Sequence, residues 1–426
     1  KLELHTASSF LFSTQPTGSL VSGPFFFKYS MSKTCNRMLN HLAQVDSAGY
    51  VIPCCQFNRK NQDTWEPYNL RNLDSFDSIL GSDLWRDLKQ RLLNQDIVEC
   101  NNCWRQENAK THSMREWAND LTVDHPGKIE SLEIGIDITC NMMCRICRPG
   151  QSSKWYSAEA QLKQLDSLQQ TLGDGGLQYR RDTVDTGNST KLLNALLNTD
   201  LSNLNNIRIN GGEPFYSKKL KPLLEKIDND AGLENVTLSF NSNGSIFPKD
   251  DILHLLEKAK FLRVDFSIDA IGELANVIRY GIDWNVIENN IDVWKNYFVK
   301  NIKFGMHSTI SLLNLNKIDE LYNFSKLKNM QWTYYVLTSP RYLSIDQLPI
   351  DIRKNYTINF DHEFITRDLN NSIVNVNMSE NLQYDLFIQS CKILDDYQGN
   401  NFKNVNSEMY NLVEELLSKI DNGNNI

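Results

Sequence analysis

The stretch Cys140-Asn141-Met142-Met143-Cys144-Arg145-Ile146-Cys147 places three cysteines within eight residues. It follows directly on an apolar, strand-like run at 134–138, which puts the thiols on a loop at the end of a strand. Three thiolates on so short a loop can hold one iron–sulfur cluster, but a four-iron cluster normally takes four ligands. The loop would therefore leave one iron open to a ligand that is not protein. The alternative is a zinc site completed by a distant fourth ligand, although zinc sites more often pair cysteines two residues apart.

Length and composition favour two or three globular domains. The chain has 426 residues, of which 41% are hydrophobic and 23% charged. No run approaches the roughly 18 apolar residues that a membrane span requires, and Phe25-Phe26-Phe27 is far too short. A positive segment followed by a bounded apolar core, as in a signal peptide, is not seen. We therefore expect no membrane contact.

Charge and cysteine usage indicate the kind of partner and the cellular compartment. The net charge is −8 without a basic cluster, which argues against general nucleic-acid binding. An odd number of cysteines, several in tight pairs, indicates metal ligation in a reducing compartment rather than a disulfide framework. We expect the cytoplasm. The nine cysteines are Cys35, Cys54, Cys55, Cys100, Cys103, Cys140, Cys144, Cys147 and Cys391.

From about residue 129 onwards, strand-like runs alternate with amphipathic helical segments. The strand-like runs are 132–138, 207–210, 236–240, 262–268, 303–310 and 332–337, and the clearest helical segments are 218–227, 251–260, 286–296 and 318–327. This alternation predicts an α/β fold with a parallel sheet and right-handed crossovers. Six units are too few for a closed eight-stranded barrel and fit an open, partial (β/α)6 barrel, although a doubly wound sheet would allow the same spacing. Active sites in such folds lie at the carboxyl ends of the strands.

Three segments lie outside the alternation. Residues 1–126 hold five cysteines and lack it, 173–189 reads as a loop inserted into the first crossover, and 339–426 reads as a polar extension with an Asn-rich, frayed end. We therefore place domain boundaries at 126/127 and 338/339.

The second strand ends in Asn210-Gly211-Gly212-Glu213-Pro214. Paired glycines let the backbone come close to a ligand, and a glutamate beside them can accept hydrogen bonds from an ammonium group. Alone, this would be an ordinary strand-to-helix turn. About sixty residues after the cysteine loop, however, it resembles the motif of the radical S-adenosylmethionine (radical SAM) enzymes, as does the cysteine spacing of three residues and then two.

The resemblance implies a cofactor site. In that family the three cysteines hold a [4Fe-4S] cluster whose open iron chelates the methionine amino and carboxylate groups of S-adenosylmethionine (SAM). Gly211, Gly212, Glu213 and Pro214 would hold the methionine end. An aromatic residue usually precedes the last cysteine and lies against the adenine; here that position is Ile146, which can still pack on a purine.

The ends of the next two strands carry weaker signals. They read Asn241-Ser242-Asn243-Gly244 and Ser267-Ile268-Asp269-Ala270, and they resemble family turns that bind the ribose diol and the carboxylate. The resemblance therefore assigns Asn243, Ser267 and Asp269 to SAM, together with Arg279, for which a surface salt bridge is an equal alternative. Turns use such residues anyway. His307 could point into the barrel, but we predict a hydrogen-bonded core histidine. No catalytic residue is assigned.

The N-terminal cysteines resemble the opening half of the auxiliary-cluster domains called SPASM, or twitch when halved. Those domains usually follow the radical SAM core, whereas here the cysteines precede it. The resemblance implies one auxiliary [4Fe-4S] cluster on Cys35, Cys54, Cys100 and Cys103, with structural zinc as the alternative. Cys55 could replace Cys54. The isolated Cys391 is predicted to be a buried inert thiol, with a donor or cluster ligand as the alternative.

The resemblance implies reductive cleavage of SAM to methionine and a 5′-deoxyadenosyl radical, which abstracts a hydrogen from the substrate. A low-potential donor such as flavodoxin or ferredoxin would supply the electron. We expect a peptide or protein side chain as substrate; a sugar, nucleoside or other metabolite is the alternative. A metal-binding interaction protein without catalysis is the third possibility.

Overall fold

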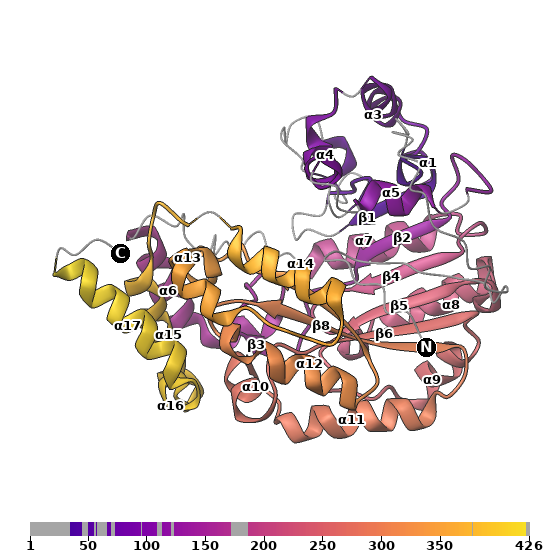
Figure 1. Ribbon diagram of the computed structural model, residues 1–426. Coiled ribbons are helices and arrows are strands. Elements are labelled where there is room, and N and C mark those ends of the chain that lie inside the picture. The colour runs from indigo at the N-terminus through magenta and orange to yellow at the C-terminus, as the bar shows by residue number, and fades with distance from the viewer. Residues whose placement is uncertain are drawn as a thin grey trace.

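The computed structural model describes residues 35–44, 50–54, 57, 66–69, 73–94, 96–108, 113–120, 123–171, 186–376 and 378–422. Within these ranges the chain forms a seven-stranded sheet in which every neighbouring pair is parallel (Figure 1). The strands, in their order across the sheet, are β1 (His41–Gln44), β2 (Ser131–Gly135), β4 (Asn206–Asn210), β5 (Thr237–Ser242), β6 (Phe261–Ser267), β8 (Ile302–Ile310) and β9 (Gln331–Val336).

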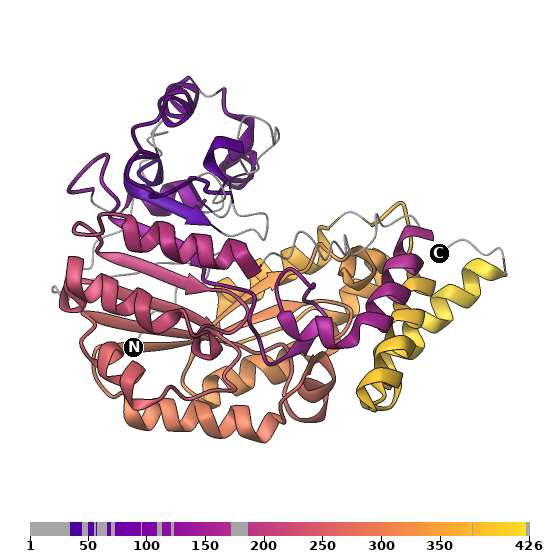
Figure 2. The ribbon, with the colours of Figure 1, turned by 180° about the vertical axis from the view of Figure 1, so that it is seen from behind.

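The six strands from β2 to β9 confirm the predicted partial barrel of the α/β class. Their spatial order follows the chain without a reversal, whereas a doubly wound sheet reverses its order at a switch point. Because each crossover is right-handed and leads to the next strand on the same side, the crossover helices lie on one face of the sheet. Figure 2 shows the molecule from the opposite side. The other face is left for the barrel interior.

Within the described residues, seven α-helices lie in the crossovers. They are α6 (Glu159–Thr171), α7 (Thr186–Asn198), α8 (Leu220–Asp230), α9 (Asp250–Glu257), α10 (Gly272–Ile278), α11 (Trp284–Tyr297) and α12 (Ile318–Leu327). Four of them, α8, α9, α11 and α12, lie at the predicted helical segments. In α8 the buried side chains are Leu220, Leu223, Leu224 and Ile227, the spacing that turns one helical face toward the sheet. Most of the insertion expected at 173–189 lies outside the described residues, and α7 begins at its end.

Alternation along the strands separates an apolar face from a polar one. In β6, Leu262, Val264 and Phe266 are buried in the hydrophobic core, whereas Arg263 and Asp265 point to the opposite face. The register aligns Arg263 with Ser239 on one side and with Lys303 on the other. The barrel interior is therefore lined by polar side chains.

The seventh strand, β1, comes from the cysteine-rich N-terminal region and was not predicted. It pairs in parallel with β2, with His41 opposite Ser131 and Gln44 opposite Ile134. Helices α1 (Arg37–Asn40), α3 (Asp83–Leu93), α4 (Asn101–Asn108) and α5 (Met114–Asn119) complete the described part of this region. The N-terminal region thus continues the sheet of the core. The boundary at 126/127 stays a prediction.

The C-terminal extension is a set of packed helices rather than a loose polar segment. It contains α13 (Ile350–Arg353), α14 (Glu363–Val374), α15 (Tyr384–Gln398), α16 (Phe402–Val405) and α17 (Ser407–Asp421). Helix α15 buries Tyr384, Phe387, Cys391 and Leu394 and lies beside α6 and α17 (Figure 1). The Asn-rich end at 423–426 lies outside the described residues. Among the helices described, none is both long and apolar enough to span a membrane.

Candidate cluster and cofactor site

The three cysteines of the loop lie where β2 ends. The Cys140 N–H donates to Ser153 Oγ at 3.1 Å, and the Met142 N–H points at the Cys140 sulfur at 3.4 Å. Two residues, β3 (Met143–Cys144), then pair in antiparallel fashion with β7 (Arg279–Tyr280), which places Cys144 opposite Arg279. The loop is thus attached to the connection after α10.

The three thiols act on one another electrostatically. Burial raises the pKa of Cys140 to about 11, and the charge of Cys144 adds to the effect. A hydrogen bond between the sulfurs of Cys144 and Cys147 raises the pKa of Cys144 and lowers that of Cys147. Thiolates gathered in a buried site need a positive partner, which a metal cluster supplies. Across the described residues, no three Cys, His, Asp or Glu side chains are arranged to hold a single metal ion directly. The fit of the triad to a cluster therefore rests on its place and its surroundings.

Arg279 and Asp269, both assigned to SAM by the resemblance, form a buried ion pair beside the triad. Arg279 Nε lies 2.7 Å from Asp269 Oδ2, and Arg279 Nη1 lies 3.8 Å from the Cys144 sulfur. Asp269 is completely buried and also accepts the Thr309 N–H at 2.7 Å. The alternative of a surface salt bridge is wrong, because the Arg279 side chain is only 11% exposed.

Gly211 and Gly212 are required first by the backbone segment that follows β2. A Cβ on Gly212 would lie 2.4 Å from the Thr139 carbonyl oxygen, and one on Gly211 would lie 2.5 Å from that of Asp137. The Gly212 and Glu213 N–H groups donate to these same carbonyls at 2.8 and 2.9 Å. The glycines therefore bring the end of β4 against the backbone that leads into the cysteine loop. Their predicted role toward a ligand stays a prediction.

Glu213 joins the ends of two strands. Its carboxylate accepts the Asn243 N–H at 2.6 Å, the Ser242 hydroxyl at 3.0 Å and the Phe215 N–H at 3.2 Å. Burial raises its pKa to about 7, although these hydrogen bonds act in the opposite direction. Pro214 is buried and opens a short 3-10 turn, Pro214–Tyr216. A carboxyl group with this pKa would become fully ionised beside an ammonium group, which fits the role that the resemblance gives to Glu213.

Asn243 connects the β5 turn to the cysteine loop. Its side-chain amide donates to Asn141 Oδ1 at 3.0 Å and lies 3.8 Å from the Cys140 sulfur. Asn141 in turn donates to Ser245 Oγ at 2.8 Å. Asn141 was missed by sequence reasoning, and its place between two cysteine ligands is the signal that could have found it. Ile146 and Ser267 are half-buried, and their contact with SAM stays a prediction.

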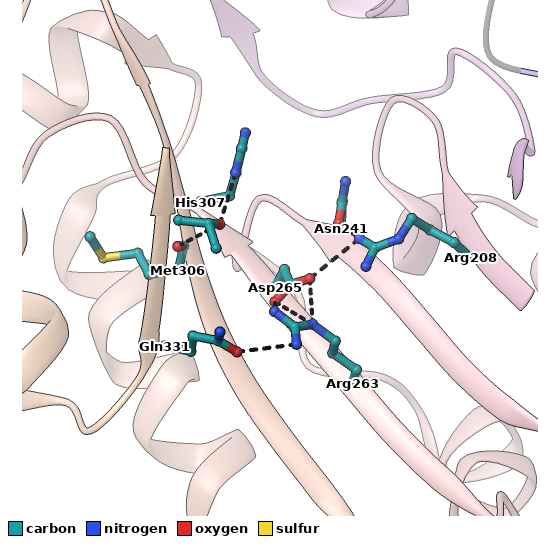
Figure 3. A network of polar contacts seen from close by, with 8 residues as sticks. Arg208, Asn241, Arg263, Asp265, Met306, His307 and Gln331 are labelled. Atoms are coloured by element: carbon teal, nitrogen blue, oxygen red, sulfur yellow. Dashed lines mark hydrogen bonds and ion pairs between the residues drawn. The ribbon is translucent and has the colours of Figure 1, made fainter. Parts of the chain in front are cut away.

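An ion network fills the inner face of the sheet below these strand ends (Figure 3). Arg263 Nε donates to both Asp265 oxygens at 2.9 and 2.8 Å, and Arg208 Nη1 approaches the same carboxylate at 3.3 Å. Although burial acts to raise it, the two arginines lower the pKa of Asp265 to about 2. Gly305 leaves the room that this carboxylate occupies, since a Cβ there would overlap Asp265 Oδ1.

His307 lies on the same inner face and is half-buried (Figure 3). Its Nδ1 is 3.0 Å from Thr333 Oγ1, as the prediction of a hydrogen-bonded histidine requires. Burial lowers its pKa, so the ring is neutral at pH 7.

The four N-terminal cysteines assigned to the auxiliary cluster lie together. Burial raises the pKa of Cys100, and the charges of Cys54, Cys35 and Cys103 raise it further. Burial also raises the pKa of Cys103 to about 11. Backbone N–H groups of Met38 and Arg115 point at the sulfurs of Cys35 and Cys103. Four mutually repelling thiolates with amide donors suit a metal cluster. Cys55 lies outside the described residues.

Residues around Cys103 that the sequence left without a role form its support. The Arg115 guanidinium lies 4.6 Å from the Trp104 ring and pairs with Glu107. Ser113 caps α5 in a capping box with Glu116. Cys391 is buried in α15 next to Arg145, and burial raises its pKa to about 12, which keeps it protonated, as expected of an inert thiol.

Comparison with known families assigns the core. Residues 138–324 match the profile of the radical SAM superfamily. Residues 138–324 therefore form a radical SAM domain. Residues 35–104 match an iron–sulfur cluster-binding domain of the SPASM type. This match confirms the prediction that the auxiliary-cluster domain precedes the radical SAM domain. The cofactors of a radical SAM domain are a [4Fe-4S] cluster and SAM, and the second match supports an iron–sulfur cluster rather than zinc at the N-terminal cysteines.

Curated relatives match part of this chain. A GTP 3′,8-cyclase of Hydrogenovibrio crunogenus is 26% identical over 180 residues, 42% of this chain and 46% of that protein. A GTP 3′,8-cyclase of Clostridium botulinum is 22% identical over 206 residues, 47% of this chain and 54% of that protein. The chain thus spans about half the length of these relatives.

Solved structures are more distant. The structure titled native anSMEcpe with bound AdoMet is 16% identical, covers 58% of this chain and 63% of its own, and has a TM-score of 0.35. The structure of Streptococcus suis SuiB bound to S-adenosylmethionine is 14% identical to this chain. The match covers 68% of this chain and 52% of SuiB, with a TM-score of 0.32.

Proposed function

We propose that this protein cleaves SAM reductively at a cluster held by Cys140, Cys144 and Cys147 and abstracts a hydrogen atom from its substrate. The observation that carries the proposal is the meeting of the cysteine loop with the Arg279–Asp269 pair at the carboxyl ends of the strands. This is the edge of a parallel sheet where ligands bind. When bound, the cluster and SAM supply a 5′-deoxyadenosyl radical.

The residues of the chain hold and orient the cofactor. The three thiolates would bind three irons, and the Glu213 carboxylate would take the positive charge of the methionine ammonium group. Arg279, held by Asp269, would offer its outer nitrogens to the methionine carboxylate. Asn243, within reach of the Cys140 sulfur, would donate to a ligand of the cluster or to the ribose. The burial of Asp269, Glu213 and Cys144 keeps water from this edge.

Cys35, Cys54, Cys100 and Cys103 would hold the auxiliary cluster, which could take up an electron from the substrate or bind the substrate directly. A flavodoxin or ferredoxin would reduce the catalytic cluster. Because thiolate ligands need a reducing compartment, we place the protein in the cytoplasm.

For the substrate we propose a peptide or protein side chain. The SPASM-type match supports this choice, because the sequence resembles enzymes of that kind which modify peptides.

A small metabolite is the second candidate. It is favoured by the relatives named GTP 3′,8-cyclase, which match 39–47% of this chain. Those proteins are named for a nucleotide substrate, and in this second candidate the radical of this chain acts on a molecule of that class.

Isotope transfer tests the function and separates the two substrates. The reconstituted full chain is incubated with SAM, dithionite and either the peptide fraction or the nucleotide fraction of cells grown in deuterated medium. Deuterium in 5′-deoxyadenosine from the peptide fraction supports the first candidate, and from the nucleotide fraction the second. Unlabelled 5′-deoxyadenosine with every fraction would contradict hydrogen abstraction from either class.

A further inference from the structure

Arg145 lies between two cysteines of the catalytic loop, and its side chain is buried, with 2% exposed. Its backbone N–H donates to the Ile278 carbonyl at 2.8 Å, and its Nε donates to the Val277 carbonyl at 3.0 Å. The arginine is therefore fixed against the end of α10, directly before the β7 residue that faces Cys144.

The outer nitrogen of Arg145 gathers acceptors from the C-terminal extension. Nη2 donates to the Asp395 carboxylate, to Gln398 Oε1 at 2.7 Å and to Asn400 Oδ1 at 3.0 Å. The second Asp395 oxygen accepts the Phe402 N–H at 2.9 Å, and the Phe402 ring lies 5.9 Å from the guanidinium carbon. All these groups belong to the last turn of α15 or to the residues that follow it.

Apolar contacts join α15 to the same loop. Leu394 packs in one cluster with Met143 of β3 and Trp155. Tyr397 lies with its ring 6.3 Å from that of Tyr280 of β7. The extension therefore touches both strands of the two-stranded ribbon that carries Cys144, as well as the arginine beside it.

A buried guanidinium is costly unless it is paired, so packing alone does not account for an arginine at this position. Its pairing with Asp395 leaves no net charge beside Cys144. The potential of an iron–sulfur cluster depends on nearby charges and on hydrogen bonds to its sulfurs. An unpaired positive charge would stabilise the reduced cluster, and an unpaired negative charge the oxidised one.

We propose that the C-terminal extension positions the catalytic cluster: Asp395 holds Arg145, Arg145 holds the loop at Cys144, and the ion pair keeps the charge beside the cluster neutral. The inference rests on the proposed function, since it takes the triad as the site of the SAM-binding cluster. Arg145 acts through Cys144 and is a positioning residue.

Charge variants of the reconstituted full chain test this. We would measure the midpoint potential of the cluster whose electron paramagnetic resonance signal changes when SAM is added. We expect Asp395→Asn to raise the potential, Arg145→Gln to lower it, and the double variant to return close to the wild type. Glu414→Gln is the control, because Glu414 pairs with Lys403 on the exposed surface of the same extension.

Shifts of opposite sign distinguish charge placement from a general loss of structure. If Asp395→Asn loses the SAM-responsive signal but keeps the auxiliary iron, and the double variant regains the signal, the proposal is also supported. It is overturned if the loaded variants keep the wild-type potential or shift with the same sign, or if the double variant loses the signal as the single one does. A wild-type protein that forms no 5′-deoxyadenosine would instead contradict the proposed function, whatever the midpoint potentials of the variants are.

Discussion

Glu213 shows how one side chain can serve both the fold and the cofactor. It is fully buried and bridges the ends of β4 and β5, so its carboxyl group is far from water while it accepts three hydrogen bonds. Burial disfavours the ionised carboxylate in the protein without cofactor and raises the pKa of Glu213 to about 7. The residue should therefore make stability depend on pH.

The sign of that dependence follows from the raised pKa. Between the unfolded value of 4.5 and the folded value of about 7, the folded chain binds more protons, so the free energy of unfolding falls as pH rises. The Glu213 contribution, fully present below pH 4.5, should fall by roughly 3 kcal/mol across this window. Glu213→Gln should lose this part of the pH dependence, as measured by urea unfolding of the reduced apo chain at several pH values.

Glu225→Gln is the matched control for this measurement, because Glu225 is half exposed on α8. Equal pH dependence in Glu213→Gln and the wild type would show that Glu213 has an ordinary pKa in the folded chain.

At the scale of elements, the sequence predicted what depends on local pattern. The strands β2, β4, β5, β6, β8 and β9 and the helices α8, α9, α11 and α12 follow from apolar periodicity. The position of the cysteine loop follows from its place after a strand-like run. Strand β1 could not be predicted in this way, because its four residues contain one large apolar side chain, Leu42, and its pairing with β2 joins residues about ninety positions apart. The C-terminal helices were missed because the strand–helix alternation ends before them.

Some residues of the candidate site could likewise be recognised from local sequence, and others could not. The cysteines, Asp269 and Arg279 were recognisable by type and spacing, and the structure brings these residues together. The partners of Arg145 could not be found from sequence, since Asp395 lies 250 residues away. The reason for Gly212 was likewise hidden, because the group that excludes a side chain there is the backbone of the segment between β2 and the cysteine loop.

Gly212 therefore carries a prediction about strand packing. Gly212→Ala would force a Cβ to within 2.4 Å of the Thr139 carbonyl oxygen, a contact that requires the two backbones to separate. We expect a loss of about 1–3 kcal/mol in the free energy of unfolding, measured by urea denaturation, because overpacking a buried site has this order of cost. Gly81→Ala is the control, since a Cβ there meets nothing closer than 4.0 Å. Equal stability of the two variants would mean that the strand ends are not in close contact.

At the scale of the whole molecule, two cysteine sites flank one sheet edge. The auxiliary cysteines belong to the region that supplies β1, the catalytic loop follows β2, and β1 and β2 are paired. The C-terminal helices pack at the other side of the loop, against α6 and β3. Segments from both ends of the chain thus support one short stretch of sequence.

Two four-iron clusters predict about eight irons per chain after anaerobic reconstitution. Replacing Cys100 and Cys103 together by alanine should lower this to about four irons while the SAM-responsive signal remains. Iron and zinc would be quantified by mass spectrometry of the purified protein. About four irons and one zinc in the wild type would show instead that the N-terminal site is structural zinc.

The most direct measurement is the formation of 5′-deoxyadenosine from SAM by the fully loaded, dithionite-reduced chain. We predict 5′-deoxyadenosine and methionine in equal amounts from the wild type and from Cys391→Ala, whose thiol lies outside the triad, and none from Cys144→Ala. A wild-type protein with its full iron content that forms no 5′-deoxyadenosine would contradict the account, and would indicate a metal-binding protein that keeps the fold without the reaction.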